Sequence, residues 1–319
     1  MPMFWLMWRR YRPQLIVLAS LLVLGGLVLP LLTSLVAEDF RTLHLDQCAG
    51  QAQYIGPCVQ RVQAFSATWN FWLEAARIGL LTLPVLLGMF LGAPLVAREL
   101  EQGTHVLGFT QSISRTRWLL TRLAVILLPS LLLTVAAQWL VLRFLLAAGD
   151  DRGPYYWTRF GISDLAPASY TLFAILLGTF AGALLRRTLP AMVVSLTATV
   201  AARVTLDALH PFLLPRRRLV TELGGWPADG SLMTGVRGYL DAQGQVLPQE
   251  AVTALHDCRQ AAPSTDQWAC WHEHGAVHGF VDVIPVAEAG TLHLVEASIF
   301  AGLAVLLFLG TIGLLRRKV

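Results

Sequence analysis

The residues best suited to metal chemistry gather in one stretch near the C-terminal third of the chain. Cys258 and Cys270 stand among four histidines, and thiolate with imidazole is a ligand set that zinc prefers. In the sequence W-H-E-H-G-A-V-H, however, the histidines on either side of Glu273 are two residues apart and lie on different helix faces, unlike those of H-E-x-x-H. We therefore predict no metal site on this chain. The histidines are His256, His272, His274 and His278.

The basic residues limit the chemistry further. The chain has 24 lysines and arginines, and its one lysine is Lys318 near the C-terminus. A phosphate-binding loop of the form G-x-x-x-x-G-K-[ST] and a Schiff base both need a lysine inside the fold. The sequence also lacks G-x-S-x-G and a G-x-G-x-x-G after a strand. We expect no enzyme activity and no cofactor on this chain, and any ATP and Mg²⁺ to be bound by another chain.

A few charged residues occur within or beside long apolar segments. Arg203 and Asp207 are four residues apart and share a helix face, and charges inside a span usually face protein or a water-filled cavity. They either line a translocation pathway or satisfy each other near the membrane interface. Glu74 with Arg77, and Glu296, lie at the ends of apolar segments, where they form a gate or act as interface anchors.

Membrane-spanning helices must position these side chains. Only 14% of the residues are charged, and the mean hydropathy is +0.58, whereas an ordinary soluble domain has about 25% charged residues. A span needs about 20 mostly apolar residues. The sequence therefore predicts an all-α polytopic membrane protein. Its six predicted spans are residues 15–37, 78–97, 123–142, 165–185, 188–209 and 297–315.

Arginines indicate the orientation of these spans. They gather in four segments: before the first span, between the second and third, between the fourth and fifth, and after the last. The only acids in these four segments are Glu99 and Glu101. The positive-inside rule places both termini in the cytoplasm of a plasma membrane, and this topology accounts for the basic charge without nucleic acid. The cluster 216–218 argues for the opposite orientation. Residues 1–13 interleave aromatics with arginines, which is typical of an interfacial elbow helix or of a stop-transfer flank.

The segment 211–292 is long and polar, and we expect it to form a small extracellular α+β domain between spans five and six, followed by residues 293–319 as the last span and cytoplasmic end. Residues 231–247 read as a hairpin, and 248–260 and 264–273 as short helices. Four cysteines lie on the external side, which favours disulfides in an oxidising compartment. We predict the local pairs Cys48 with Cys58 and Cys258 with Cys270.

The cytoplasmic loop 98–122, within the membrane region 14–210, carries the clearest functional pattern. A span ends in a charged turn with Glu99 and Glu101, breaks at Gly103, and is followed by a short segment before the next span. Acids at a helix C-terminus are unfavourable against the helix dipole. A basic or polar partner protein would account for them. A solvated turn whose glutamates cap a helix end is the simpler interpretation.

This loop, R-E-x-E-x-G-T followed by S-x-S-R-x-R-W-x-L, resembles the coupling loop of ABC-2 type permeases, the membrane subunits of ATP-binding-cassette exporters. W-L-M-W-R-R-Y-R-P-Q resembles the elbow helix of a bacterial, actinobacterial branch of that family, and V-E-A-S-I-F-A-G-L the start of its last span. Many members carry a further charged pair where this chain has Leu100 and Gln102. The resemblance implies coupling residues Arg98, Glu99, Glu101, Gly103, Thr104, Ser112, Ser114, Arg115 and Arg117.

The resemblance also implies a function and partners. It indicates a dimer of this chain with a second copy or a close relative, surrounded by membrane lipid and driven by cytoplasmic ATPase subunits. Spans rich in leucine and valine suit an amphipathic drug, lipid or peptide as the exported substrate. The alternative is a membrane sensor or accessory subunit whose extracellular domain binds a ligand.

Overall fold

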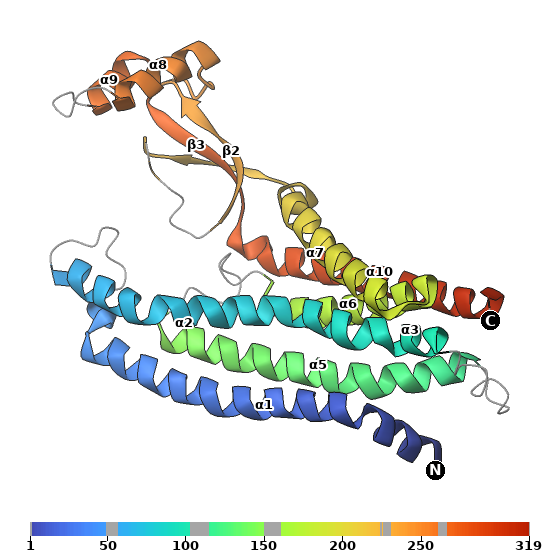
Figure 1. The fold of residues 1–319 in the computed structure, drawn as a ribbon. Coiled ribbons are helices and arrows are strands. Elements are labelled where there is room, and N and C mark those ends of the chain that lie inside the picture. The colour runs from blue at the N-terminus through green and yellow to red at the C-terminus, as the bar shows by residue number, and fades with distance from the viewer. Residues whose placement is uncertain are drawn as a thin grey trace. The chain divides into compact units, whose positions relative to one another are not determined.

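The computed structural model describes residues 2–48, 57–102, 115–149, 161–223, 225, 231–260 and 267–318 (Figure 1). The chain forms two compact units. The first, the membrane unit, comprises residues 1–154, 161–205 and 293–319, and the second, the sheet unit, comprises residues 155–160 and 206–292. Within the described residues, six helices are long and apolar enough to cross a membrane.

The six helices match the six predicted spans, and most are longer than predicted. An apolar run in the sequence ends at the first charged residue, whereas the backbone hydrogen bonds of the helix continue through the interfacial turns. The second span continues from α2 through a single π-helical turn, η2, into α3. The helices are α1 (Pro2–Thr42), α2 (Pro57–Leu87), η2 (Gly88–Gly92), α3 (Ala93–Glu101), α5 (Arg115–Ala147), α6 (Ala166–Leu185), α7 (Thr188–Leu213) and α10 (Ala289–Lys318).

The N-terminal elbow is not a separate helix in the structure. Helix α1 runs without a break from Pro2 to Thr42 and contains Pro13 and Pro30 in its interior. Proline removes one backbone donor, but a helix in an apolar environment continues through it because the freed carbonyl finds other partners. The side chains of residues 1–11 lie outside the described residues, so an interfacial position for this end stays a prediction.

Helix α6 packs against α2, η2 and α3 with almost no side chain between the backbones. Gly88 and Gly92, at the two ends of η2, lie against the backbone of α6 at Ala174 and Ile175. In α6, Gly178 lies against Gly88 and Gly92, and Gly182 lies against Ala93. A Cβ atom added to Gly178 would collide with the carbonyl oxygen of Gly88 and would lie 2.6 Å from the backbone nitrogen of Ala93. Small residues allow such close approach of membrane helices, where dispersion contacts replace the hydrophobic effect. We call these four glycines the glycine seam.

A second core joins α1, α2 and α5 at the other end of the membrane unit. The indole nitrogen of Trp69 donates a hydrogen bond to Asp39 Oδ2 at 2.8 Å, which ties α2 to α1. Cys48, in the 3-10 turn η1 (Leu45–Cys48), forms a disulfide with Cys58 of α2, as predicted. The buried side chains of this core are Val36, Leu45, Phe65, Trp69 and Phe144.

The sheet unit contains a three-stranded antiparallel sheet with the order β1-β3-β2. Its strands are β1 (Arg217–Thr221), β2 (Leu232–Leu240) and β3 (His278–Ile284), and its helices are α8 (Gln249–Gln260) and α9 (Gln267–Glu273), followed by the turn η4 (Val286–Glu288). The Cys258–Cys270 disulfide joins α8 to α9, as predicted. Leu223, Leu255 and Trp271 form the small core around it.

The hairpin predicted for 231–247 forms only at its turn. The turn after β2 does form, because Asp241 N–H donates to the Gln245 carbonyl oxygen at 2.9 Å, but the returning chain makes only the bridge from Leu240 to Val246. The main partner of β2 is β3, almost forty residues further along the chain. The sequence G-F-V-D-V-I of β3 is buried along most of its length, so it supplies the apolar surface that a local return strand lacks.

Candidate functional site

The membrane unit brings the predicted coupling residues that the structure describes to one end of the helix bundle. Successive helices alternate in direction, so α3 ends, α5 begins and α6 turns into α7 at the same end (Figure 1). We call this the basic end, because Arg98, Arg117, Arg186 and Arg187 lie there and are exposed. Gly103, Thr104, Ser112 and Ser114 lie outside the described residues, and Arg115 is described only by its backbone.

Glu99 forms a buried ion pair across two helices. Its Oε1 lies 2.5 Å from Nη1 of Arg122 in α5, and the two side chains are 4% and 6% exposed. The guanidinium of Arg122 also stacks over the ring of the buried Trp118, 4.0 Å from its centroid. A buried charge is tolerated only with a close partner. This pair therefore fixes the end of α3 against the first turns of α5.

Glu101 caps the next helix along the bundle. Its Oε2 accepts hydrogen bonds from the backbone N–H of Thr188 at 3.0 Å and from the Thr188 hydroxyl at 2.7 Å. Thr188 is the first residue of α7. A carboxylate is unfavourable at the end of α3 but favourable at the start of α7, where the dipole has the opposite sign. Both acids thus have partners within the chain, and their predicted contact with an ATPase stays a prediction.

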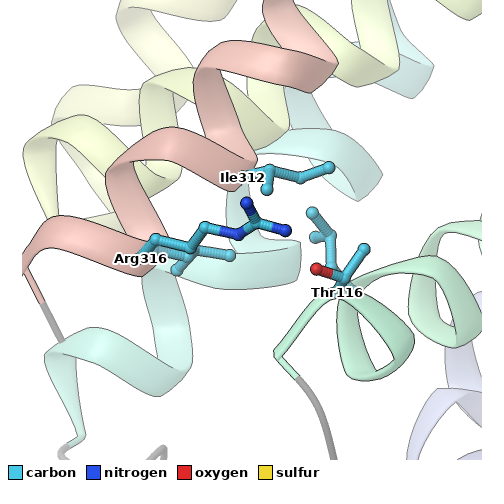
Figure 2. A pocket seen from close by; sticks show the side chains of 5 residues that line it. Thr116, Ile312 and Arg316 are labelled. Atoms are coloured by element: carbon cyan, nitrogen blue, oxygen red, sulfur yellow. The ribbon is translucent and has the colours of Figure 1, made fainter.

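A shallow recess lies between α5 and α10 at the same end. Figure 2 shows Arg316 of α10 directed toward Thr116 in the first turn of α5, with Ile312 beside it. Leu119 and Leu315 complete the lining. The contact places the end of the last span next to the start of the third.

A polar cluster, the outer cluster, lies at the opposite end of the membrane unit. The hydroxyl of Tyr170 in α6 donates a short hydrogen bond to Oε1 of Glu296 in α10, and both side chains are buried. The guanidinium of Arg203 in α7 stacks over the ring of Tyr170 at 4.0 Å and donates to the carbonyl oxygen of Leu81 at 3.3 Å. One buried tyrosine thus connects α6, α7 and α10.

A second link of the outer cluster runs one turn away along α10. Nδ1 of the buried His293 lies 3.4 Å from Oδ2 of Asp164 in the loop before α6. The backbone carbonyl of Asp164 accepts a hydrogen bond from the side-chain amide of Gln138 in α5 at 2.9 Å. Ser163, in the same loop, is 1% exposed. The loop 161–165 is therefore held by α5 on one side and by α10 on the other.

The remaining pathway candidates, Asp207, Glu74 and Arg77, have partners on their own helices. Oδ1 of Asp207 lies 3.4 Å from Nδ1 of His210, while Arg203 stacks on Tyr170, so of the two alternatives for Arg203 and Asp207 the structure does not show the mutual pair. The aromatic face offers the guanidinium a less hydrated site than an exposed carboxylate does. Glu74 and Arg77 form an ion pair of 3.3 Å within α2.

Two of the three arginines in the cluster 216–218 form ion pairs within the sheet unit. Arg217 forms an ion pair of 3.1 Å with Glu288, and Arg218 one of 2.9 Å with Asp282. The hydrogen bond to Asp282 raises the pKa of the Arg218 guanidinium above its ordinary value. The positive-inside rule counts basic residues rather than net charge, so the orientation of the sheet unit stays a prediction.

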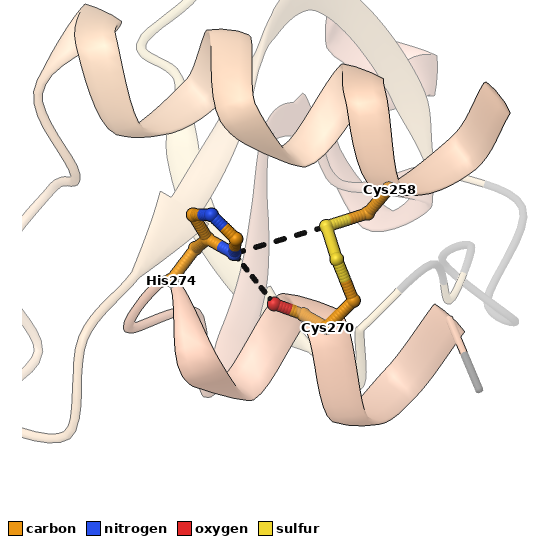
Figure 3. A group of neighbouring side chains, drawn as sticks. All are labelled: Cys258, Cys270 and His274. Carbon is orange, nitrogen blue, oxygen red and sulfur yellow. Dashed lines mark hydrogen bonds between the residues drawn. A yellow bond between two sulfur atoms is a disulfide. The ribbon is translucent and has the colours of Figure 1, made fainter. Parts of the chain in front are cut away.

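Three of the metal-ligand candidates, Cys258, Cys270 and His274, are engaged in other bonds (Figure 3). Nδ1 of His274 lies 2.8 Å from the Cys270 carbonyl oxygen and 3.8 Å from Sγ of Cys258. These three residues are the one group of metal-ligating side chains close enough to share an ion among the described residues. Because both sulfurs form the disulfide, neither offers a thiolate.

Sequence reasoning missed five residues of these two sites. Arg122 and Trp118 were placed in the flank of a span, and Tyr170, His293 and Asp164 were not singled out. Arg122 lies next to the start of the predicted span 123–142, and such a border arginine is normally assigned to the interface. The signal that could have identified it is the four-residue spacing from Trp118, which places both side chains on one helix face.

The comparison with protein families agrees with this architecture. The model of the family described as ABC-2 membrane transporter related matches residues 18–210, which extend from α1 to the end of α7. The chain belongs to this family. It is therefore a multi-pass membrane protein and a transporter membrane component. No curated protein and no solved structure matches the chain.

Proposed function

We propose that this chain is the permease subunit of a bacterial ATP-driven exporter for an amphipathic substrate. Two copies, or this chain with a close relative, form the pathway in the plasma membrane. Separate ATPase subunits bind ATP and Mg²⁺ at the basic end, which faces the cytoplasm together with both termini. Membership of the ABC-2 membrane transporter related family supports this function, and the distribution of arginines supports the orientation.

The observation that carries the proposal is the way in which α3 is fixed to its neighbours. Glu99 binds Arg122 of α5, Glu101 caps α7 at Thr188, and the backbone of α3 lies directly against Gly182 of α6. Helix α3 carries the first residues of the predicted coupling loop 98–122 and leads directly into residues 103–114 of that loop. A movement of this loop caused by an ATPase would therefore be transmitted to three spans, α5, α6 and α7, because α3 is joined to them by close-packed contacts.

The coupling role is tested with two exposed arginines of the same helix. Arg117 lies near the first turn of α5 at the basic end, and Arg143 lies near the far end. Arg117→Glu is expected to lower copurification of the ATPase encoded beside this chain by about tenfold, because charge reversal at an interface costs more than about 1 kcal/mol. Arg143→Glu is the matched control and should leave copurification unchanged.

The experiment can reject the proposal. If no nucleotide-binding chain copurifies with the tagged wild-type protein after mild solubilisation, the exporter assignment fails and a sensor function of the sheet unit becomes the better hypothesis. If both variants reduce copurification equally, the ATPase does not dock at the start of α5.

We also propose that the outer cluster closes the external end of the pathway and opens during the cycle. Three polar links, from Glu296, Arg203 and His293, join α10 and α7 to α6 and its preceding loop. When hydrogen bonds and ion pairs of this kind break, water replaces the protein partner, so the free-energy cost of breaking them is moderate. Such links suit a closure that must be broken and reformed in every cycle.

Opening is measured at Ser163, which is buried in the loop 161–165. The native cysteines described here form disulfides, so a Ser163→Cys variant offers one reactive thiol to a membrane-impermeant maleimide. ATP with the ATPase partner is expected to raise its labelling rate about tenfold or more, since the closed state exposes 1% of this side chain. A Leu165→Cys control, at a position that is 58% exposed, should react equally with and without ATP. An unchanged rate at residue 163 would contradict the closure.

A further inference from the structure

A recess lies at the basic end, beside the contact of Glu101 with Thr188. It has a volume of about 700 Å³ and lies between the end of α3 and the turn from α6 to α7. Its lining combines two guanidinium groups, one carboxylate and an apolar wall. The residues are Leu100, Glu101, Arg186, Arg187, Leu189 and Pro190.

The turn that carries the two arginines is held on both sides. Arg186 adopts a left-handed conformation with φ of 54°, and its N–H donates to the Gly182 carbonyl oxygen at 3.0 Å. Gly182 belongs to the glycine seam, which fixes α6 against α3. Two residues later, Thr188 is bound by Glu101. The side chains of Arg186 and Arg187 therefore project from a short turn with a fixed backbone.

The charge balance in the recess favours an anion. The carboxylate of Glu101 already accepts two hydrogen bonds from Thr188, so part of its negative charge is compensated. Two of the side chains that line the recess are basic and one is acidic. Guanidinium groups bind phosphate through paired N–H donors, and adjacent arginines can approach one phosphate together.

The apolar wall indicates that the bound phosphate carries a hydrophobic group. Leu189 is 76% exposed, and Val193, one turn further along α7, is 59% exposed. Pro190 is exposed between them. The recess therefore opens onto an apolar flank of α7 that continues along the span. A soluble phosphate would contact only the arginines, whereas an amphiphile would contact both the arginines and this flank.

We propose that this recess binds the phosphate of an anionic membrane phospholipid in the leaflet at the basic end, with the acyl chain along Leu189 and Val193. The inference needs only a chain that spans a membrane, and it does not depend on coupling to an ATPase. The ligand either regulates the protein or enters it as a substrate through this leaflet, and both roles begin with the same binding step.

The test uses the full chain in phosphatidylcholine nanodiscs. Thermal unfolding is followed while phosphatidylglycerol is added, with inorganic phosphate in a parallel series. Phosphatidylglycerol is expected to raise the unfolding temperature of the wild-type protein, because a ligand that binds only the native state stabilises it. Arg186→Gln and Arg187→Gln should each raise the half-maximal lipid fraction about tenfold, which is the effect of losing one charge-assisted hydrogen bond.

Arg12→Gln is the matched control, because Arg12 is an exposed arginine of α1 at the same end but does not line the recess. It should respond to phosphatidylglycerol as the wild-type protein does. An equal loss in all three variants, or no shift in the wild-type protein, would overturn the proposal. A shift produced by inorganic phosphate alone would replace the lipid with a soluble phosphate. Loss of ATPase copurification in the Arg186 and Arg187 variants, with an unchanged lipid response, would assign the recess to a protein contact instead.

Discussion

Replacing Arg122 with alanine is expected to lower the free energy of unfolding by about 3–5 kcal/mol, which is the cost of leaving one buried charge without its partner. Glu99 is nearly fully buried, so water cannot take the place of the lost guanidinium. The substitution also removes the cation that stacks on Trp118. Unfolding in mild detergent, followed by size-exclusion chromatography of a fluorescent fusion after heating, measures the loss.

Two further variants distinguish the contribution of the ion pair to stability from a general effect of removing an arginine. Arg117→Ala removes an exposed arginine one turn earlier in the same helix and should change stability by less than about 0.5 kcal/mol. The double variant Glu99→Leu with Arg122→Leu removes both charges and should recover much of the loss, because no unpaired charge remains. Equal stability of Arg122→Ala and Arg117→Ala would show that the pair does not hold α3 to α5.

The second large effect on stability is expected at the glycine seam. Gly178→Ala is expected to destabilise the membrane unit by about 3 kcal/mol, at the upper end of the range for overpacking. The new methyl group would collide with the Gly88 carbonyl oxygen and would lie 2.6 Å from the Ala93 nitrogen. Both are backbone atoms, so no rotamer change can relieve the clash. The heating assay used for Arg122 measures it.

Gly79→Ala is the matched control for this substitution. Gly79 lies in α2, and a Cβ atom there meets nothing within 4 Å. Alanine is favoured over glycine in a helix by about 1 kcal/mol, so this variant should be at least as stable as the wild-type protein. If the two alanine variants behave alike, the close approach of α6 to η2 and α3 does not contribute to stability.

The spans and disulfides could be predicted because each depends on local features of the sequence. Residues 165–185 are apolar enough to require a membrane, and α6 occupies Ala166–Leu185. Cys258 and Cys270 are close in sequence, and α8 and α9 bring them together. In both cases the residues that determine the feature are close together in the sequence. Tertiary packing therefore changes only where each helix begins and ends.

The partners across helices could not be predicted, because they depend on which faces meet. Glu99 reads as an exposed acid at a helix end until α5 supplies Arg122. Arg203 has an acid four residues away, yet it stacks on Tyr170 of α6. The strand β2 likewise pairs with the distant β3. A single sequence contains no signal for such contacts, since several partners satisfy the same local pattern equally well.

The register of the three-stranded sheet has a consequence for how such a protein can change during evolution. Arg217 at the start of β1 pairs with Val283 near the end of β3, so the chain enters and leaves the sheet at neighbouring positions. Paired residues of antiparallel strands lie about 5 Å apart. A segment whose ends lie this close can be lengthened, shortened or exchanged while the two adjoining spans keep their connection. The family match, which stops at residue 210, is consistent with a shared transporter body that carries a replaceable module.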